Sequence, residues 1–183
     1  MRMAAKTRAW MRDDLEHLPD DGNRYEVLDG ALFVTPQAKF DHQVIANGIS
    51  VALTLYCRQF GLGAVVGPGA VVFGNNELQP DVQVVPGPPP HAGVEWKDLP
   101  VPILVVEVLS DSTARRDVGK KREAYLLLNI PTYWVVDASA RHVLVWTSER
   151  DEPVTMTDVL RWQPSDSHPP LEIPVESILP PTH

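Results

Sequence analysis

The stretch Ile103-Leu-Val-Val-Glu-Val-Leu109 decides the fold of this 183-residue chain. It is apolar on both faces apart from Glu107, a pattern that is typical of a central strand buried between two layers. A carboxylate inside such a strand costs several kcal/mol unless it is exposed at the strand end, paired, protonated or bound to a cation. The sequence therefore predicts an α/β domain with a polar site at this strand.

Two helices are expected around the central strand. From Asp41 to Phe60, apolar residues recur at three- and four-residue spacing, with Asp41 as an N-cap and Gly61 as the stop. A second helix is predicted from Asp117 to Leu128, after the helix-starting residues Ser110-Asp-Ser-Thr113 and before Asn129 and Pro131.

Further strands are predicted from short β-rich segments. Asp29-Gly30 is a strong turn signal, so residues 24–34 are expected to form an N-terminal β-hairpin after a short helix at residues 7–18. The remaining strands are expected at residues 64–66, 70–73, 81–85, 132–136 and 142–146.

Length and composition favour a single domain over residues 1–183. A Pro-rich loop is expected at residues 86–102, and an irregular Pro-rich tail from about residue 163. A lone cysteine, Cys57, and the lack of a signal or a long apolar segment favour a cytoplasmic protein with no membrane partner. The net charge of −8 argues against a protein that coats nucleic acid through its overall field.

Two carboxylates are expected to meet at neighbouring strand ends. Asp81 opens its strand after Pro80, and Glu107 lies near the end of its own. Oxygen ligands of this kind suit a hard cation, Mg²⁺ or Mn²⁺, and the backbone carbonyl of Val108 could add one more ligand.

A lysine side chain on the second helix is expected to point toward these carboxylates. Lys121 shares a helix face with Asp117 and Tyr125, whereas Lys120 points about 100° away. Two carboxylates, a divalent cation and a lysine are the groups that phosphodiester hydrolysis requires. Each of these residues alone would more often be structural or solvated, so the hypothesis depends on their combination.

Six short motifs follow one another along most of the chain: Tyr25-Glu26-Val-Leu-Asp29-Gly30, His42 at the start of the long helix, Pro80-Asp81-Val82, Glu107-Val-Leu-Ser110-Asp-Ser-Thr113, Asp117…Lys121…Tyr125 and Tyr133-Trp134-Val-Val-Asp137. In this order they resemble the Uma-type family of putative restriction endonucleases, within the PD-(D/E)XK nuclease superfamily. The resemblance implies a restriction endonuclease-like core, a mixed β-sheet flanked by helices.

The same resemblance implies the roles of the site residues. Asp81 and Glu107 would be metal ligands and Lys121 the catalytic lysine, with Glu26 and His42 as further polar positions near the cleft. The superfamily's lysine normally stands two residues after the acidic residue, where this chain has Leu109. Lys121, on the following helix, would therefore take the role of this lysine in catalysis. Alternatively, His42 is a local helix-start residue and Glu26 a hairpin residue that faces water.

The expected function is a metal-dependent endonuclease acting on DNA. The alternative is a nuclease-fold protein without turnover that binds nucleic acid or regulates, which the acidic net charge and Leu109 would suit. A serine hydrolase at Ser110 fits less well, because the chain has no Gly-x-Ser-x-Gly nucleophile elbow. A glycosidase also fits less well, because the lysine that follows the two carboxylates fits metal binding better. A homodimer would suit duplex cleavage, with an interface around exposed Trp96, Trp146 and Trp162.

Overall fold

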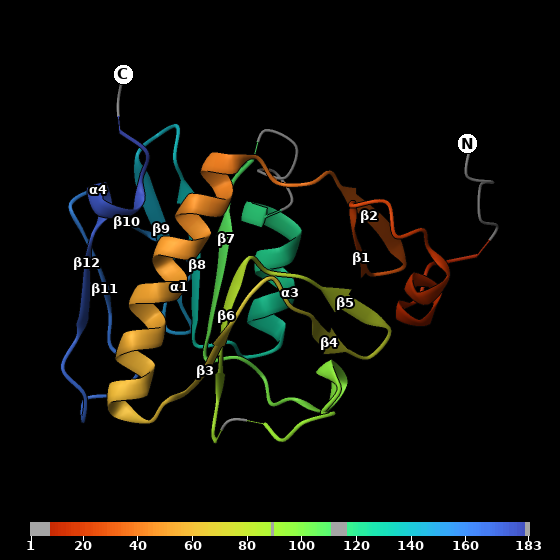
Figure 1. The fold of residues 1–183 in the computed structure, drawn as a ribbon, viewed down its shortest axis with the longest axis horizontal. Helices are drawn as coiled ribbons and strands as arrows, with labels where there is room; N and C mark the ends of the chain where they lie inside the picture. The colour runs from red at the N-terminus through yellow and green to blue at the C-terminus, as the bar shows by residue number, and fades with distance from the viewer. Residues whose placement is uncertain (1–7, 89, 111–116, 182–183) are drawn as a thin grey trace.

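The computed structural model describes residues 8–88, 90–110 and 117–181 (Figure 1). Its centre is a six-stranded sheet in the order β10-β9-β8-β7-β6-β3. The strand predicted around Glu107 is β7, which pairs antiparallel with β6 and parallel with β8. The six strands are β3 (Gly63–Val66), β6 (Val82–Pro86), β7 (Leu104–Val108), β8 (Thr132–Asp137), β9 (His142–Thr147) and β10 (Val154–Met156).

Both faces of this sheet are covered, as the two-sided apolar pattern of β7 predicts. On one face, α1 (Phe40–Phe60) and α4 (Val175–Ile178) pack with a two-stranded sheet, β11 (Val159–Trp162) and β12 (Leu171–Pro174), over a core that includes Val106 and Val108. On the other face, α3 (Arg122–Leu127) shares a core with Val105. Because side chains alternate along a strand, Glu107 lies on the same face as Val105 and is turned toward α3.

A second, four-stranded sheet stands beside α3 in the order β2-β1-β5-β4. Its strands are β1 (Arg24–Leu28), β2 (Ala31–Thr35), β4 (Val71–Phe73) and β5 (Asn76–Leu78). The predicted hairpin is confirmed in β1 and β2, and both turn residues have positive φ, 51° at Asp29 and 77° at Gly30. This is the conformation that a tight hairpin turn requires.

The helix predicted at residues 7–18 forms only at Arg12–His17, and there as a 3₁₀-helix. The N–H of Trp10 donates to the carbonyl of Gly30, and that of Arg12 to the carbonyl of Asn75. These bonds tie the segment to two turns of the second sheet, so the backbone follows the sheet instead of its own helix.

The long helix is confirmed, with Gly61 at φ 65° as its C-cap, but it begins at Phe40 and Asp41 lies inside its first turn. The second predicted helix divides into a π-helical turn at Asp117–Lys121 and α3. The predicted helix start at residues 111–113 lies outside the described residues. No helix in the described ranges is long and apolar enough to cross a membrane.

The expectation of an irregular tail is also wrong. Residues 171–174 form β12, which pairs with β11, and residues 175–178 form α4. Ile173, Val175 and Ile178 are buried in the core beneath α1. Burial of these spaced apolar residues explains why a Pro-rich segment is ordered here.

Candidate active site

The carboxyl group of Asp81 lies beside the strand that carries Glu107. Val82 pairs with Val106, so Asp81 comes next to Glu107 across the two strands. The backbone N–H of Asp81 donates to the carbonyl of Val106 at 3.1 Å, and the N–H of Val108 donates to Oδ2 of Asp81 at 2.8 Å. The strands therefore bring the two predicted residues to neighbouring positions, as their sequence context indicates.

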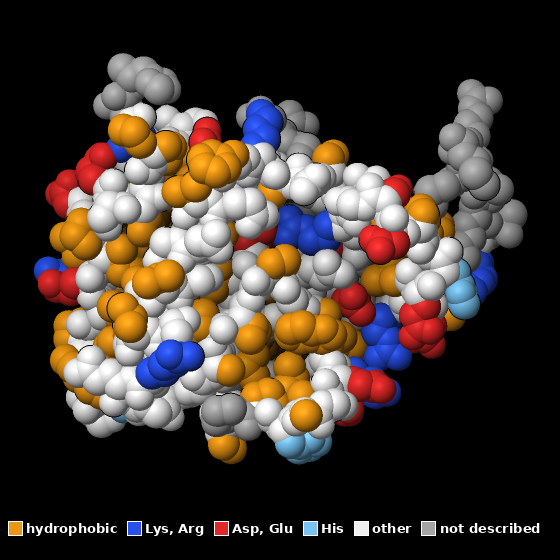
Figure 2. All heavy atoms as spheres, viewed as in Figure 1, with side chains coloured by type: hydrophobic (Ala, Val, Ile, Leu, Met, Phe, Trp, Pro, Cys, Tyr) orange, Lys and Arg blue, Asp and Glu red, His pale blue; other side chains and the backbone are white. Residues whose placement is uncertain are grey.

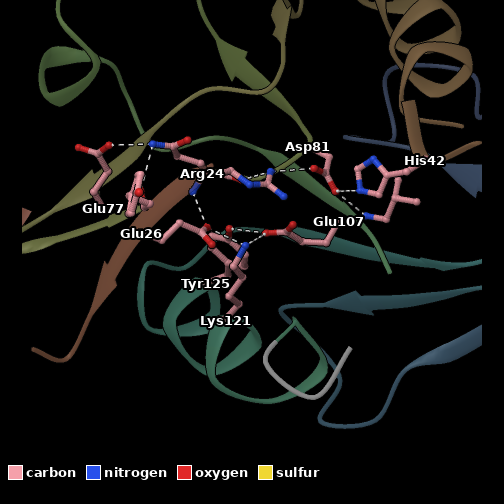
Figure 3. Close-up of polar contacts among 11 residues, drawn as sticks. Arg24, Glu26, His42, Glu77, Asp81, Glu107, Lys121 and Tyr125 are labelled. Atoms are coloured by element: carbon pink, nitrogen blue, oxygen red, sulfur yellow. Dashed lines mark hydrogen bonds and ion pairs between the residues drawn. The ribbon is translucent and has the colours of Figure 1, made fainter. Parts of the chain in front are cut away.

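Two side chains hold Asp81. Nη1 of Arg24 lies 2.8 Å from Oδ1, and Nε2 of His42 lies 3.1 Å from Oδ2 (Figure 3). Burial by itself would raise the pKa of Asp81. The hydrogen bond from His42 and the charge of Arg24 outweigh burial and lower this pKa from 3.8 to about 2. Asp81 is therefore an ionised carboxylate in a largely buried position.

Glu107 belongs to a second, deeper cluster. Nζ of Lys121 lies 2.7 Å from Oε1 of Glu107 and 2.8 Å from Oε1 of Glu26. The hydroxyl of Tyr125 donates to Oε1 of Glu107 at 3.0 Å. Glu26 and Lys121 are 0% exposed and Glu107 is 1% exposed. The helix face predicted for Lys121 and Tyr125 thus does reach Glu107, while the alternative that Glu26 faces water is wrong.

Neighbouring groups also act on Tyr125 and Arg24. Burial and the charge of Glu107 raise the pKa of Tyr125 well above its ordinary value, so its hydroxyl stays protonated and acts as a donor. Although burial lowers the pKa of Arg24, the carboxylates of Asp81, Glu107 and Glu26 raise it overall. Arg24 therefore remains charged between the two clusters.

Arg24 is the residue that the sequence analysis missed. Besides Asp81, its Nη1 contacts the carbonyl of Gln79 at 2.8 Å, and Figure 3 shows it between Asp81 and Glu26. Arg24 and Glu26 are two residues apart on β1, which places them on one face of that strand. The signal was an Arg-x-Glu alternation in the hairpin, which becomes informative only once β1 is known to place Arg24 against Asp81 and Glu26 against Lys121.

Two cavities lie beside Arg24 and His42, of which the smaller is lined by Asp81 and neither by Lys121. One of about 160 Å³ is lined in part by Arg24, His42 and Asp81. The other, of about 430 Å³, is lined by Arg24, His42, Lys39, Val108, Ser110 and Ser139 among others. Arg24 and His42 stand in both walls. The surface that a substrate can reach is therefore built from Arg24, His42, Asp81 and Ser110, with Glu107 and Lys121 behind it.

The other predicted residues have mixed outcomes. Lys120 is exposed, with Nζ 5.9 Å from the ring centroid of Phe33, which agrees with the prediction that it points away from Lys121. The backbone of Asp117 lies in the π-helical turn, and its side chain is not described. The expected aromatic interface is wrong at two of its three positions, because Trp146 and Trp162 are each only 4% exposed.

The donor types suit a hard divalent cation, since Asp81 and Glu107 offer buried carboxylate oxygens from adjacent strands. In this arrangement those oxygens contact Arg24, His42 and Lys121. Among the described residues, no group of three or more His, Cys, Asp or Glu side chains is arranged to hold a metal ion. A cation at Asp81 and Glu107 would therefore have to displace or share these contacts.

Comparisons with known proteins agree on the fold. A family model described as "Uma2: Putative restriction endonuclease" matches residues 12–177. A crystal structure of a "putative nuclease belonging to DUF820" from Anabaena variabilis ATCC 29413 is similar, with a TM-score of 0.74 and 15% sequence identity, over 92% of this chain and 96% of that one. No curated protein matches the chain. At this identity the structural likeness concerns the fold alone.

Proposed function

We propose that this chain, which belongs to the Uma2 family of putative restriction endonucleases, is a nuclease that hydrolyses phosphodiester bonds in DNA with Mg²⁺ or Mn²⁺. The observation that carries the proposal is the pair of neighbouring carboxylates, Asp81 just before β6 and Glu107 on β7, with Asp81 lining a cavity beside Arg24 and His42. Asp81 and Glu107, with the backbone carbonyl of Val108, would hold the metal ion. A divalent ion at such a site lowers the pKa of a bound water and neutralises charge that develops on the phosphate.

The protein's own groups would divide the remaining work. Arg24 and His42 line both cavities, so they would contact the phosphate and orient it above Asp81. Ser110 and Ser139 offer hydroxyl groups in the larger cavity for the sugar or phosphate oxygens. Lys121 is fully buried and acts in this arrangement as a positioning residue for Glu107 and Glu26. A catalytic role of its ammonium group requires that one of these ion pairs opens.

A nuclease fold that binds without turnover is the second candidate. It is favoured by the ion pairs themselves, because Arg24 and Lys121 already neutralise the carboxylates that a metal ion would need. A protein of this type would bind nucleic acid through Arg24, Lys39 and His42, with no divalent ion.

The test is cleavage of supercoiled plasmid, single-stranded DNA and RNA, each with Mg²⁺, Mn²⁺ or EDTA. Asp81→Asn and Glu107→Gln remove the proposed ligands' charge with little change in shape, and Lys120→Ala is the matched surface control. Metal-dependent DNA cleavage by the wild type and Lys120→Ala, lost in both ligand variants, is the expected result. Cleavage of RNA alone would reassign the substrate. Metal-independent binding without cleavage of any substrate would favour the second candidate.

A further inference from the structure

The outer face of α1 carries a row of exposed apolar side chains. Phe40, Val44, Val51 and Leu55 are 81%, 46%, 60% and 66% exposed. At 100° per residue these positions fall within a stripe about 60° wide. Figure 2 shows hydrophobic side chains along the course of α1 on the viewed face. We call Phe40, Val44, Val51 and Leu55 the α1 stripe.

The same helix carries almost no charged side chains. Between Asp41 in its first turn and Arg58 in its last turn, α1 contains no Asp, Glu, Lys or Arg. A surface helix ordinarily exposes charged residues on the face opposite the core. An apolar, charge-depleted centre with charges only at the rim is instead the composition of the core of a protein interface.

We propose that two copies of this chain pair through the α1 stripe, with the two helices antiparallel. A two-fold axis between residues 49 and 50 places Val44 opposite Leu55 of the partner subunit, and the reverse. Val44 and Leu55 thus meet twice across the axis, whereas Val51 lies opposite Gly48 of the partner subunit and Phe40 opposite Gln59 of the partner subunit. A face that matches itself in this way is what a two-fold symmetric interface requires.

The rim charges support the antiparallel direction. With the same axis, Asp41 of one copy lies at the level of Arg58 of the partner subunit, so opposite charges approach at both ends. The opposite helix-dipole ends also come together. A parallel pair would bring Asp41 toward Asp41 of the partner subunit and Arg58 toward Arg58 of the partner subunit. Charge complementarity therefore selects a second copy in the antiparallel direction.

Anionic partners fit the stripe less well. The stripe has one acidic and one basic end instead of a basic border. An anionic membrane or a nucleic acid backbone would find no compensating positive patch along it. A second copy of the chain offers the same apolar groups and, in the antiparallel direction, the opposite charge at each end. It therefore matches both the apolar centre and the charged ends of the stripe.

Pairing through α1 would also relate the two candidate active sites. The first turn of α1 supplies Asp41 and His42 to the larger cavity. These residues lie about 12 Å along the helix from the two-fold axis, so the two cavities would be separated by about 25 Å along the paired helices. The proposed pairing does not depend on the proposed nuclease activity, because the experiments that test it measure oligomeric state.

The first experiment measures molar mass by size-exclusion chromatography with light scattering over a concentration series. The wild type is expected to dimerise, and Leu55→Glu is expected to be monomeric over the same range. Leu127→Glu is the matched control, because Leu127 is an 84% exposed leucine on α3. A wild type that stays monomeric, or a dimer that Leu55→Glu leaves intact, would overturn the proposal. Circular dichroism establishes that each variant is folded.

The second experiment tests the direction of pairing. Asp41→Arg and Arg58→Asp should each weaken the dimer about fivefold, since each replaces attraction by repulsion at both ends. The double variant Asp41→Arg/Arg58→Asp restores opposite charges and should dimerise as the wild type does. A double variant weaker than either single variant would exclude the antiparallel arrangement.

Discussion

Replacing Lys121 by methionine tests whether the buried ion cluster holds the fold together. Methionine keeps the length and most of the volume of the side chain but removes the ammonium group. Glu26 and Glu107, which are 0% and 1% exposed, would then lose the cation that lies 2.8 and 2.7 Å from them. The matched control is Lys120→Met, because Lys120 is exposed and its Nζ lies 5.9 Å from the centroid of the Phe33 ring.

The expected loss follows from the burial of both carboxylates. Removing one member of a buried ion pair costs about 3–5 kcal/mol, since it leaves a charge without compensation in a poorly solvated place. Arg24 stays nearby and attracts both Glu26 and Glu107, which places the expected loss toward about 3 kcal/mol. Lys120→Met should cost less than about 1 kcal/mol, the size of an exposed cation–π contact.

Urea unfolding at pH 7, followed by tryptophan fluorescence, measures both losses. Trp134, Trp146 and Trp162 are buried and therefore report on the core. The free energy of unfolding of Lys121→Met should fall by about 3 kcal/mol with an unchanged m-value. The reasoning fails if Lys121→Met is as stable as the wild type, or if Lys120→Met loses as much. Either result would mean that the Glu26–Lys121–Glu107 cluster carries little of the stability.

Two further perturbations test neighbouring parts of the site. The pKa of Asp81 is about 2 in the folded chain against 3.8 ordinarily, so its contribution of about 2.5 kcal/mol is present above pH 4 and is lost as the pH falls to 2. Urea unfolding in a pH series should show this loss in the wild type but not in Asp81→Asn, and equal pH slopes would contradict it. In Gly67→Ala, a Cβ would stand 2.0 Å from the backbone oxygen of Asp81, so we expect a loss of about 2–3 kcal/mol. Thermal unfolding compares it with Gly119→Ala, where nothing lies within 4 Å, and equal midpoints would refute the clash.

The parts of the fold that the sequence predicts correctly are those set by local patterns. The hairpin turn needs two residues that tolerate positive φ, and Asp29-Gly30 supplies them. The run at residues 103–109 is apolar on both faces, so it lies inside the sheet whichever strands flank it. The long helix is recognised from its buried face at Ile45, Ile49 and Leu53.

The parts that the sequence does not reveal depend on contacts between distant segments. β5, β10, β11 and β12 are short, and pairing with a partner strand determines them more than their own composition does. The same holds for Arg24, which meets Asp81 across 57 positions of the chain. The exposed residues of the α1 stripe escaped notice for a different reason, because periodicity identifies the apolar positions of a helix but not which of them stay uncovered.

The sequence shows only in part why the cation beside Glu107 is Lys121 and not the residue at position 109. Leu109 stands two positions after Glu107, on the same face of the chain as α3, and packs against the core of that face. A lysine there would have to bury its charge among these apolar groups. Lys121 instead reaches Glu107 from the helix, where Glu26 and Tyr125 share the environment of the same carboxylate. Placing the cation in the π-helical turn before α3 lets position 109 remain apolar while Glu107 keeps its ion pair.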